Sequence, residues 1–286
     1  MNPYEYDELC RLLRERSGLD LSAGKQYLVD SRLQPVVDRA GLAGLGALMQ
    51  RLKAPNAESL KAEVVEAMTT KETFFFRDKV PFENFCNVMM PALMTARAAQ
   101  RQIRIWCAAA ATGQEPYSLA IALAEMGGKV DGWRVEILAT DLSNTALDRA
   151  RAGIYSQLEV QRGLPIQMLI KYFTRVDEIW QIAPELRARI HFQQLNLLDD
   201  FSHLGTFDVV FCRNVLIYFD VPTKSEVLDR LARVVADDGY LVLGGAETVM
   251  GLTKGFNVVA DQAGLYSPRA APVRFAAPLQ VAAAPR

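Results

Sequence analysis

The sequence has few histidines and no closely spaced cysteines. Only two histidines, His191 and His203, occur among the 286 residues, so a multi-histidine zinc or iron site is not expected and we predict no bound metal. The four cysteines are Cys10, Cys86, Cys107 and Cys212. They lie far apart without a CxxC pair, which is typical of unpaired thiols in a reducing compartment such as the cytoplasm.

Long apolar runs and an excess of charge are also absent. No run of about 18 apolar residues occurs, and residues 1–16 are charged and helical in pattern, unlike a signal peptide. We therefore expect a cytoplasmic protein that is neither exported nor membrane-spanning. The formal net charge of −1 and the isoelectric point near 6.2 argue against nucleic acid as the main partner, because phosphate binding usually leaves a basic excess.

The periodicity of apolar residues divides the chain into two parts. Between residues 4 and 69 apolar side chains recur at helical spacing, as at Leu9, Leu12 and Leu13, which predicts a small all-helical domain over 1–75. From residue 103 onward, helical stretches alternate with short apolar runs at 103–106, 135–140, 190–195, 207–212 and 239–243. This alternation predicts an α/β domain over 76–268 with a mainly parallel sheet.

Three further segments have distinct local patterns. Residues 171–190 include VDEIWQIA, which alternates in places and predicts a short β-hairpin inserted before the third main strand. Residues 256–267 have the pattern of a strand, a turn and a strand, which predicts an antiparallel edge of the sheet. The segment 269–286 is rich in alanine and proline and lacks acidic residues, so we expect a disordered tail.

A loop of small residues follows the first expected strand. Alanines, a threonine and a glycine occupy 108–113, and Pro116 then suits the first turn of a helix. Small side chains let a ligand lie against the backbone at the carboxyl end of the strand, where open α/β sheets bind nucleotides. A tight turn packed with alanine, without any ligand, fits the same residues.

Asp141 ends the second expected strand. A carboxylate at that place can accept hydrogen bonds from both hydroxyl groups of a ribose, although Asp141 or Ser143 can also simply cap the next helix. The chain has no GxGxxG sequence to cradle a pyrophosphate. The loop and Asp141 together favour an adenosine ligand. Because the chain has no pyrophosphate cradle, S-adenosylmethionine is favoured over a dinucleotide.

Four segments together resemble one family. They are MTTKETFFFR (68–77), IRIWCAAAATGQEPYSLA (103–120), ATDLSNTALDRARAGIY (139–155) and FDVVFCRNVLIYFD (207–220). In sequence, order and spacing they closely resemble the chemotaxis receptor methyltransferases, the CheR family. The resemblance runs from about residue 5 to residue 268.

The resemblance implies a fold and a reaction. The implied fold is a class I S-adenosylmethionine-dependent methyltransferase domain, Rossmann-like, preceded by a small all-helical domain and carrying a small β-subdomain insertion. The implied enzyme is a protein-glutamate O-methyltransferase that acts on methyl-accepting chemotaxis receptors. Its products would be glutamate 5-O-methyl esters and S-adenosylhomocysteine.

The resemblance also implies a set of cofactor contacts. By motif they fall on Lys71, Thr73, Arg77, Glu115, Asp141, Asn196, Leu197, Arg213 and Asn214. In this assignment Arg77 pairs with the methionine carboxylate, Asp141 with the ribose and Asn196 with the adenine edge. Two positions depart from the family pattern, since relatives often carry asparagine at Lys71 and commonly glutamate at Gln114.

Methyl transfer to a carboxylate requires no general base. A glutamate with a pKa of about 4.3 is already ionised at neutral pH, so the enzyme contributes positioning and a desolvated site. Tyr218, just after the fourth strand, is the candidate for orienting the acceptor, and Arg104 for holding its carboxylate. The alternatives are a buried aromatic residue packed beside Phe219 and a surface arginine at a strand start.

Receptor recognition is expected on the helical domain. Lys25, Arg32 and Arg39 are spaced by seven, so they share one face of a continuous helix and suit the acidic methylation helices of a receptor. The alternative is a solvated face interleaved with Asp30 and Asp38. In some family members the β-subdomain also binds a pentapeptide at the receptor tail. The hairpin here is short and lacks a glycine-containing loop, so we predict recognition through the helical domain alone, by a monomer.

Two rival functions stay open. An RNA or DNA methyltransferase of the same class would usually carry an Asp/Asn-Pro-Pro-aromatic motif after the fourth strand, where this chain has Arg213-Asn214-Val215-Leu216. A non-catalytic S-adenosylmethionine-binding regulator is the second rival. It is disfavoured because all matching site positions hold residues able to bind a ligand.

Overall fold

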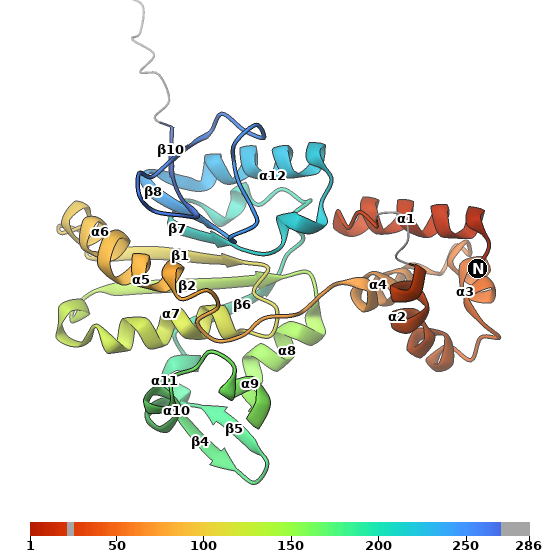
Figure 1. Cartoon of the computed structure of the whole chain (residues 1–286), viewed down its shortest axis with the longest axis horizontal. Coiled ribbons are helices and arrows are strands. Elements are labelled where there is room, and N and C mark those ends of the chain that lie inside the picture. Colours follow the sequence, from red (N-terminus) through yellow and green to blue (C-terminus); the bar gives the residue numbers. More distant parts are fainter. Residues whose placement is uncertain (22–25, 270–286) are drawn as a thin grey trace, which may run out of the picture.

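The computed structural model describes residues 1–21 and 26–269 of the chain (Figure 1). An all-helical body formed by residues 3–21 and 26–68 lies beside an α/β body that contains the rest of the described chain. Lys25 and the expected tail from residue 270 onward lie outside the described residues. Within the described part of the chain, no helix is both long enough and apolar enough to cross a membrane.

Four helices form the N-terminal body. They are Pro3–Ser17 (α1), Gln26–Arg39 (α2), Leu45–Leu52 (α3) and Glu58–Met68 (α4). α1 begins with a capping box, in which Asn2 and Glu5 exchange side chain-to-backbone hydrogen bonds, and it is followed by Gly18 in a left-handed conformation. The apolar faces of the four helices meet in one core around Leu9 and Leu33. This is the all-helical domain that the sequence predicts.

A seven-stranded sheet forms the centre of the second body, in the order β6-β2-β1-β7-β8-β10-β9. The strands are Gln102–Ala108 (β1), Arg134–Asp141 (β2), Ile190–Gln194 (β6), Phe207–Cys212 (β7), Val235–Leu243 (β8), Phe256–Val258 (β9) and Leu265–Pro268 (β10). The first five in spatial order pair in parallel, and β10 is antiparallel to both β8 and β9. The predicted mainly parallel sheet with an antiparallel C-terminal edge is confirmed.

Helices cover both faces of this sheet. They are Val80–Asn84 (α5), the π-helical turn Phe85–Met89 (η1), Met90–Ala96 (α6), Gln114–Glu125 (α7), Asn144–Ala152 (α8) and Val221–Val234 (α12). Shorter turns are Gly127–Val130 (η2), Ser202–Leu204 (η3) and Leu216–Tyr218 (η4). Side chains of β1 alternate between the faces, because Ile103 and Ile105 join the core with α5, α6 and α7, whereas Trp106 joins the core with α12.

A second, three-stranded sheet is inserted between β2 and β6. It consists of Ile154–Ser156 (β3), Phe173–Val176 (β4) and Ile179–Ile182 (β5), in the order β3-β5-β4. Short helices accompany it, namely Gln157–Gln161 (α9), Ile166–Tyr172 (α10) and Pro184–Arg187 (α11). β4 and β5 form the hairpin expected within 171–190, but the insertion already begins with β3. Three residues are too few to show an alternating pattern, so β3 could not be predicted from periodicity.

Gly163, between α9 and α10, brings the insertion against the linker that joins the two bodies. Its φ is +84°, and a Cβ there would lie 2.0 Å from the carbonyl oxygen of Phe75. Gly41 has a similar φ of +65° with nothing within 4 Å of the same position. Substitution of Gly41 by alanine therefore introduces backbone strain alone, whereas substitution of Gly163 introduces backbone strain and steric overlap.

We predict that Gly163→Ala lowers the free energy of unfolding by about 3 kcal/mol or more, whereas Gly41→Ala lowers it by only about 1 kcal/mol. The difference arises because only Gly163→Ala forces the linker backbone to move. Thermal unfolding measures this, at about 2–4 °C of melting temperature per kcal/mol. Equal shifts for the two variants would contradict the contact with Phe75.

Candidate functional site

A pocket lies where the carboxyl ends of four parallel strands face the helical domain. The lining residues that follow these strands are Ala109, Ala111, Asp141, Leu142, Leu195, Asn196, Leu197, Arg213, Asn214 and Val215. Ser17 at the end of α1, Leu19 just after it, and residues of the linker 69–79 line it from the other side. The space between these residues measures about 920 Å³ with the open solvent at its mouth included.

The loop after β1 brings its backbone close to the pocket. Ala109, Ala111 and Gly113 have φ values of 61°, 47° and 94°. A Cβ at Gly113 would lie 2.9 Å from the Cβ of Ala150, so only glycine lets the loop pack this closely against α8. Ala109 and Ala111 themselves line the pocket. The small side chains thus serve both the tight turn and the open space in front of it.

Asp141 is fixed by two backbone groups. Its Oδ2 accepts a hydrogen bond from the N–H of Ala111 at 2.8 Å, and its Oδ1 accepts one from the N–H of Ser143 at 2.8 Å. Ser143, not Asp141, caps α8, since its hydroxyl accepts from the N–H of Ala146. Burial raises the pKa of Asp141, and the two N–H groups oppose that rise. The carboxylate keeps lone pairs that can accept hydroxyl groups of a ligand.

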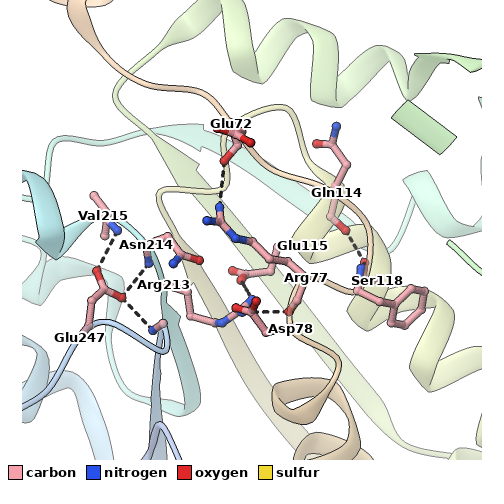
Figure 2. Close-up of polar contacts among 12 residues, drawn as sticks. Glu72, Arg77, Asp78, Gln114, Glu115, Ser118, Arg213, Asn214, Val215 and Glu247 are labelled. Carbon is pink, nitrogen blue, oxygen red and sulfur yellow. Dashed lines mark hydrogen bonds and ion pairs between the residues drawn. The ribbon is translucent and has the colours of Figure 1, made fainter. Parts of the chain in front are cut away.

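Arg213 lines the pocket and is the buried centre of an ionic cluster (Figure 2). Its Nη1 donates to Glu115 at 2.9 Å, and its Nη2 donates to Asp78 at 2.7 Å and to the carbonyl oxygen of Arg77 at 2.9 Å. Only 1% of the Arg213 side chain is exposed. Burial raises the pKa of Glu115, and the charge of Arg213 opposes that rise. The cluster joins the loop after β7 to the start of α7 and to the linker.

The linker is held in a strained conformation beside this cluster. Phe76, Asp78 and Lys79 all have positive φ, between 50° and 69°. Arg77 is thereby turned toward the pocket, where its Nη1 donates to the carbonyl oxygen of Glu72 at 3.0 Å (Figure 2). A cationic side chain over an enclosed site is suited to an anionic group of a ligand.

Glu247 orders the loop after β7, a role that the sequence analysis missed. Its two carboxylate oxygens accept four backbone N–H groups, and Figure 2 shows those of Asn214 and Val215 among them. These belong to Asn214, Val215, Ile217 and Gly244, at 2.7, 3.0, 3.3 and 2.8 Å. A lone glutamate about 30 residues after the loop gives no sign of such a contact. Only the parallel pairing of β7 with β8 brings the two segments together.

Nine of the sequence-predicted residues line this pocket. They are Thr73, Arg77, Glu115, Asp141, Asn196, Leu197, Arg213, Asn214 and Tyr218. Lys71 instead lines a neighbouring groove, with its Nζ 3.4 Å from a carboxylate oxygen of Glu66. The amide of Asn196 donates to the carbonyl oxygen of Arg16 at 2.8 Å, so it joins the two domains. One N–H of the amide is used in this bond, and the expected contact of Asn196 with an adenine edge stays a prediction.

The expectation for Arg104 is wrong. Its guanidinium lies toward the amino end of β1, whereas the pocket opens at the carboxyl end. There it contacts Glu136 at 3.2 Å and donates to the carbonyl oxygens of Thr206 and Leu204. Arg104 therefore has the alternative, structural role at a strand start and cannot touch a ligand in the pocket.

The basic residues of α2 do not form one free face. Arg32 turns inward, where it donates to the carbonyl oxygen of Met68 and to the hydroxyl of Thr70. Arg39 is 61% exposed and pairs with Glu63. With Lys25 outside the described residues, Arg39 alone keeps the expected outward position. The spacing of seven placed these residues on one side of the helix, but Arg32 binds the end of α4 instead of solvent.

Comparison with known proteins gives a consistent result over most of the chain. Residues 4–69 match the CheR methyltransferase, all-alpha domain, and residues 71–265 match the CheR methyltransferase, SAM binding domain. Chemotaxis protein methyltransferase Cher2 of Pseudomonas putida is 39% identical, covering 91% of this chain and 96% of its own length. Chemotaxis protein methyltransferase 1 of Pseudomonas aeruginosa is 42% identical, covering 90% and 95%. The chemotaxis protein methyltransferase of Salmonella typhimurium is 34% identical, covering 88% and 86%.

We predict that Glu247→Gln lowers the free energy of unfolding by about 2–3 kcal/mol, because either orientation of the amide sets its NH₂ group against backbone N–H groups that now find an oxygen. Urea denaturation monitored by tryptophan fluorescence measures the loss. Glu226→Gln, at an exposed position of α12, is the matched control and should change stability by less than about 0.5 kcal/mol. An unchanged denaturation midpoint for Glu247→Gln would show that the four hydrogen bonds do not contribute to the free energy of unfolding.

Proposed function

This chain belongs to the CheR family of S-adenosylmethionine-dependent methyltransferases, and from that premise we propose that it methylates glutamate side chains of chemotaxis receptors. The products would be glutamate 5-O-methyl esters and S-adenosylhomocysteine. The observation that carries the proposal is the pocket at the carboxyl ends of β1, β2, β6 and β7. It gathers nine residues expected for cofactor and acceptor from distant parts of the sequence.

The residues of the pocket suit the parts of S-adenosylmethionine. Each carboxylate oxygen of Asp141 accepts one backbone N–H and keeps a lone pair that can accept a ribose hydroxyl group. Arg77 suits the methionine carboxylate. Leu195 and Leu197 offer an apolar surface for the adenine ring, and the second N–H of the Asn196 amide suits its edge. When bound, S-adenosylmethionine supplies an electrophilic methyl group on a sulfonium.

The chain's own contribution to the reaction is positioning. The acceptor carboxylate is ionised at neutral pH, so no residue needs to remove a proton. Tyr218 lines the pocket, and its backbone carbonyl oxygen accepts a hydrogen bond from the backbone N–H of Asp20 at 2.8 Å. This bond fixes the position of Tyr218 between the two domains. We propose that the Tyr218 side chain orients the acceptor carboxylate. Exclusion of water from the site by the bound acceptor would then favour attack by the carboxylate over attack by water.

The proposed partners are the cytoplasmic helices of methyl-accepting receptors, met by a monomer through its helical domain. Support comes from the position of that domain, whose α1 reaches the pocket with Ser17 and Leu19. A receptor helix lying on the helical domain would therefore pass close to the methyl group. Arg39 is the exposed basic residue that suits an acidic helix there.

We predict that the protein transfers radiolabelled methyl groups from S-adenosylmethionine to receptor-containing membranes of its source organism, and that the label is released by base as methanol. Asp141→Ala should reduce the transfer at least about a hundredfold if both ribose contacts are lost, since each charge-assisted bond contributes roughly 1.5–3 kcal/mol. Arg134→Ala, an exposed substitution at the far end of β2, is the control and should retain full transfer.

Other outcomes point to the rival functions. Binding of S-adenosylmethionine without base-labile label on any receptor would favour a regulator over an enzyme. Label that resists base and appears on nucleic acid would favour a nucleic acid methyltransferase. Either result contradicts the proposed acceptor without contradicting the cofactor.

We also propose that recognition does not need a pentapeptide at the receptor tail. The loop between β4 and β5 has only two residues, Asp177 and Glu178, and neither is glycine. We predict that deleting the last five residues of a receptor leaves its methylation rate within about twofold, the range of a weak contact. Calorimetry with receptor tail peptides is the direct test, and micromolar or tighter binding would contradict the proposal.

A further inference from the structure

Glu66 lies near the end of α4 in the helical domain, yet its hydrogen bonds reach into the other domain. Its Oε1 accepts from the hydroxyl of Ser143 at 2.8 Å and from the backbone N–H of Thr145 at 3.2 Å. Lys71, on the linker, stands 3.4 Å from the same oxygen. A carboxylate in the last turns of its own helix is locally unfavourable, because the helix dipole is negative there. At the start of α8 the same charge is favourable, since that end of the dipole is positive.

The contact completes the N-terminal cap of α8. Ser143 satisfies the N–H of Ala146, while Glu66 satisfies the N–H of Thr145. The same Ser143 donates its own backbone N–H to the Oδ1 of Asp141. A continuous chain of hydrogen bonds therefore runs from α4 of the helical domain, through the cap of α8, to the carboxylate in the pocket.

We propose that Glu66 is a positioning residue for cofactor binding, which holds from the helical domain the turn that carries Asp141. The proposal rests on the proposed contact between Asp141 and the ribose. It assigns to Glu66 no contact with the cofactor itself, since the pocket is lined by Asp141 and Leu142 but not by Glu66. It also makes cofactor affinity depend on how the helical domain is seated against the methyltransferase domain.

The test is calorimetric titration of the full chain with S-adenosylhomocysteine, which needs no receptor. We expect Glu66→Ala to weaken binding about tenfold, a change of about 1.4 kcal/mol. Glu66→Gln should remain within about threefold of wild type, because its carbonyl oxygen can accept the same two hydrogen bonds. Glu63→Ala is the control on the same helix, where the side chain pairs with Arg39, and it should stay within about twofold.

The pH dependence of binding distinguishes positioning from general loss of stability. Arg77, Glu115 and Arg213 line the same pocket as Asp141, but the charges that shift the pKa of Asp141 are those of Glu66, which raises it, and Lys71, which lowers it. The affinity for S-adenosylhomocysteine should be highest above the pKa of Asp141 and should fall as the pH drops through that pKa, because a protonated carboxyl group accepts fewer hydrogen bonds from hydroxyl groups. This fall is the acid limb of the pH profile. Removing the negative charge in Glu66→Gln lowers the pKa of Asp141, so the acid limb should move to lower pH. Asp141→Asn should abolish that limb.

The outcomes separate this proposal from the one on which it rests. If Asp141→Asn binds S-adenosylhomocysteine as tightly as wild type, the ribose contact is refuted. If Asp141→Asn weakens binding but Glu66→Ala stays within about twofold, the role of Glu66 is refuted. If Glu66→Ala lacks a cooperative melting transition, Glu66→Asp is the second variant. It withdraws the carboxylate by one methylene group and should weaken binding about threefold. Wild-type affinity in Glu66→Asp would refute the role of Glu66 as well.

Discussion

The buried guanidinium of Arg213 joins the segments that make the pocket. It lies at the end of β7 and pairs with Glu115 at the start of α7 and with Asp78 in the linker. Removing one partner from such a cluster leaves an uncompensated charge, which typically costs about 3–5 kcal/mol. The positive φ values of the linker are tolerated because this cluster holds it down. Arg77 owes its place over the pocket to the same constraint.

The two domains share the pocket. Ser17 and Leu19 line it from α1, the amide of Asn196 binds the backbone of Arg16, and Glu66 binds the cap of α8. A helical domain that only recognised a partner would have no need of these contacts. Because they bear on the residues around the cofactor, seating of the helical domain and shape of the pocket are physically coupled.

Residue type and position in the sequence were poor guides to the use of individual arginines. Arg104 and Arg213 both lie on strands or at their ends, yet only Arg213 stands at the carboxyl end where the pocket opens. Arg32 follows the seven-residue spacing of an exposed stripe but binds the end of α4. The difference in each case is the direction of a long side chain, which depends on the carbonyl and carboxylate groups that neighbouring elements place within reach.

The sequence by itself determined the class of fold, the cofactor and nine of the residues that line the pocket. Strand periodicity gives a parallel sheet, all parallel strands end at one edge, and the residues just after them must therefore meet there. Only the tertiary structure decided the contacts of Glu247, Glu66 and Asn196, and the start of the insertion at Ile154. These depend on pairs of segments that are distant in sequence and carry no local pattern. A hydrogen bond between such segments exists only once packing has brought them together.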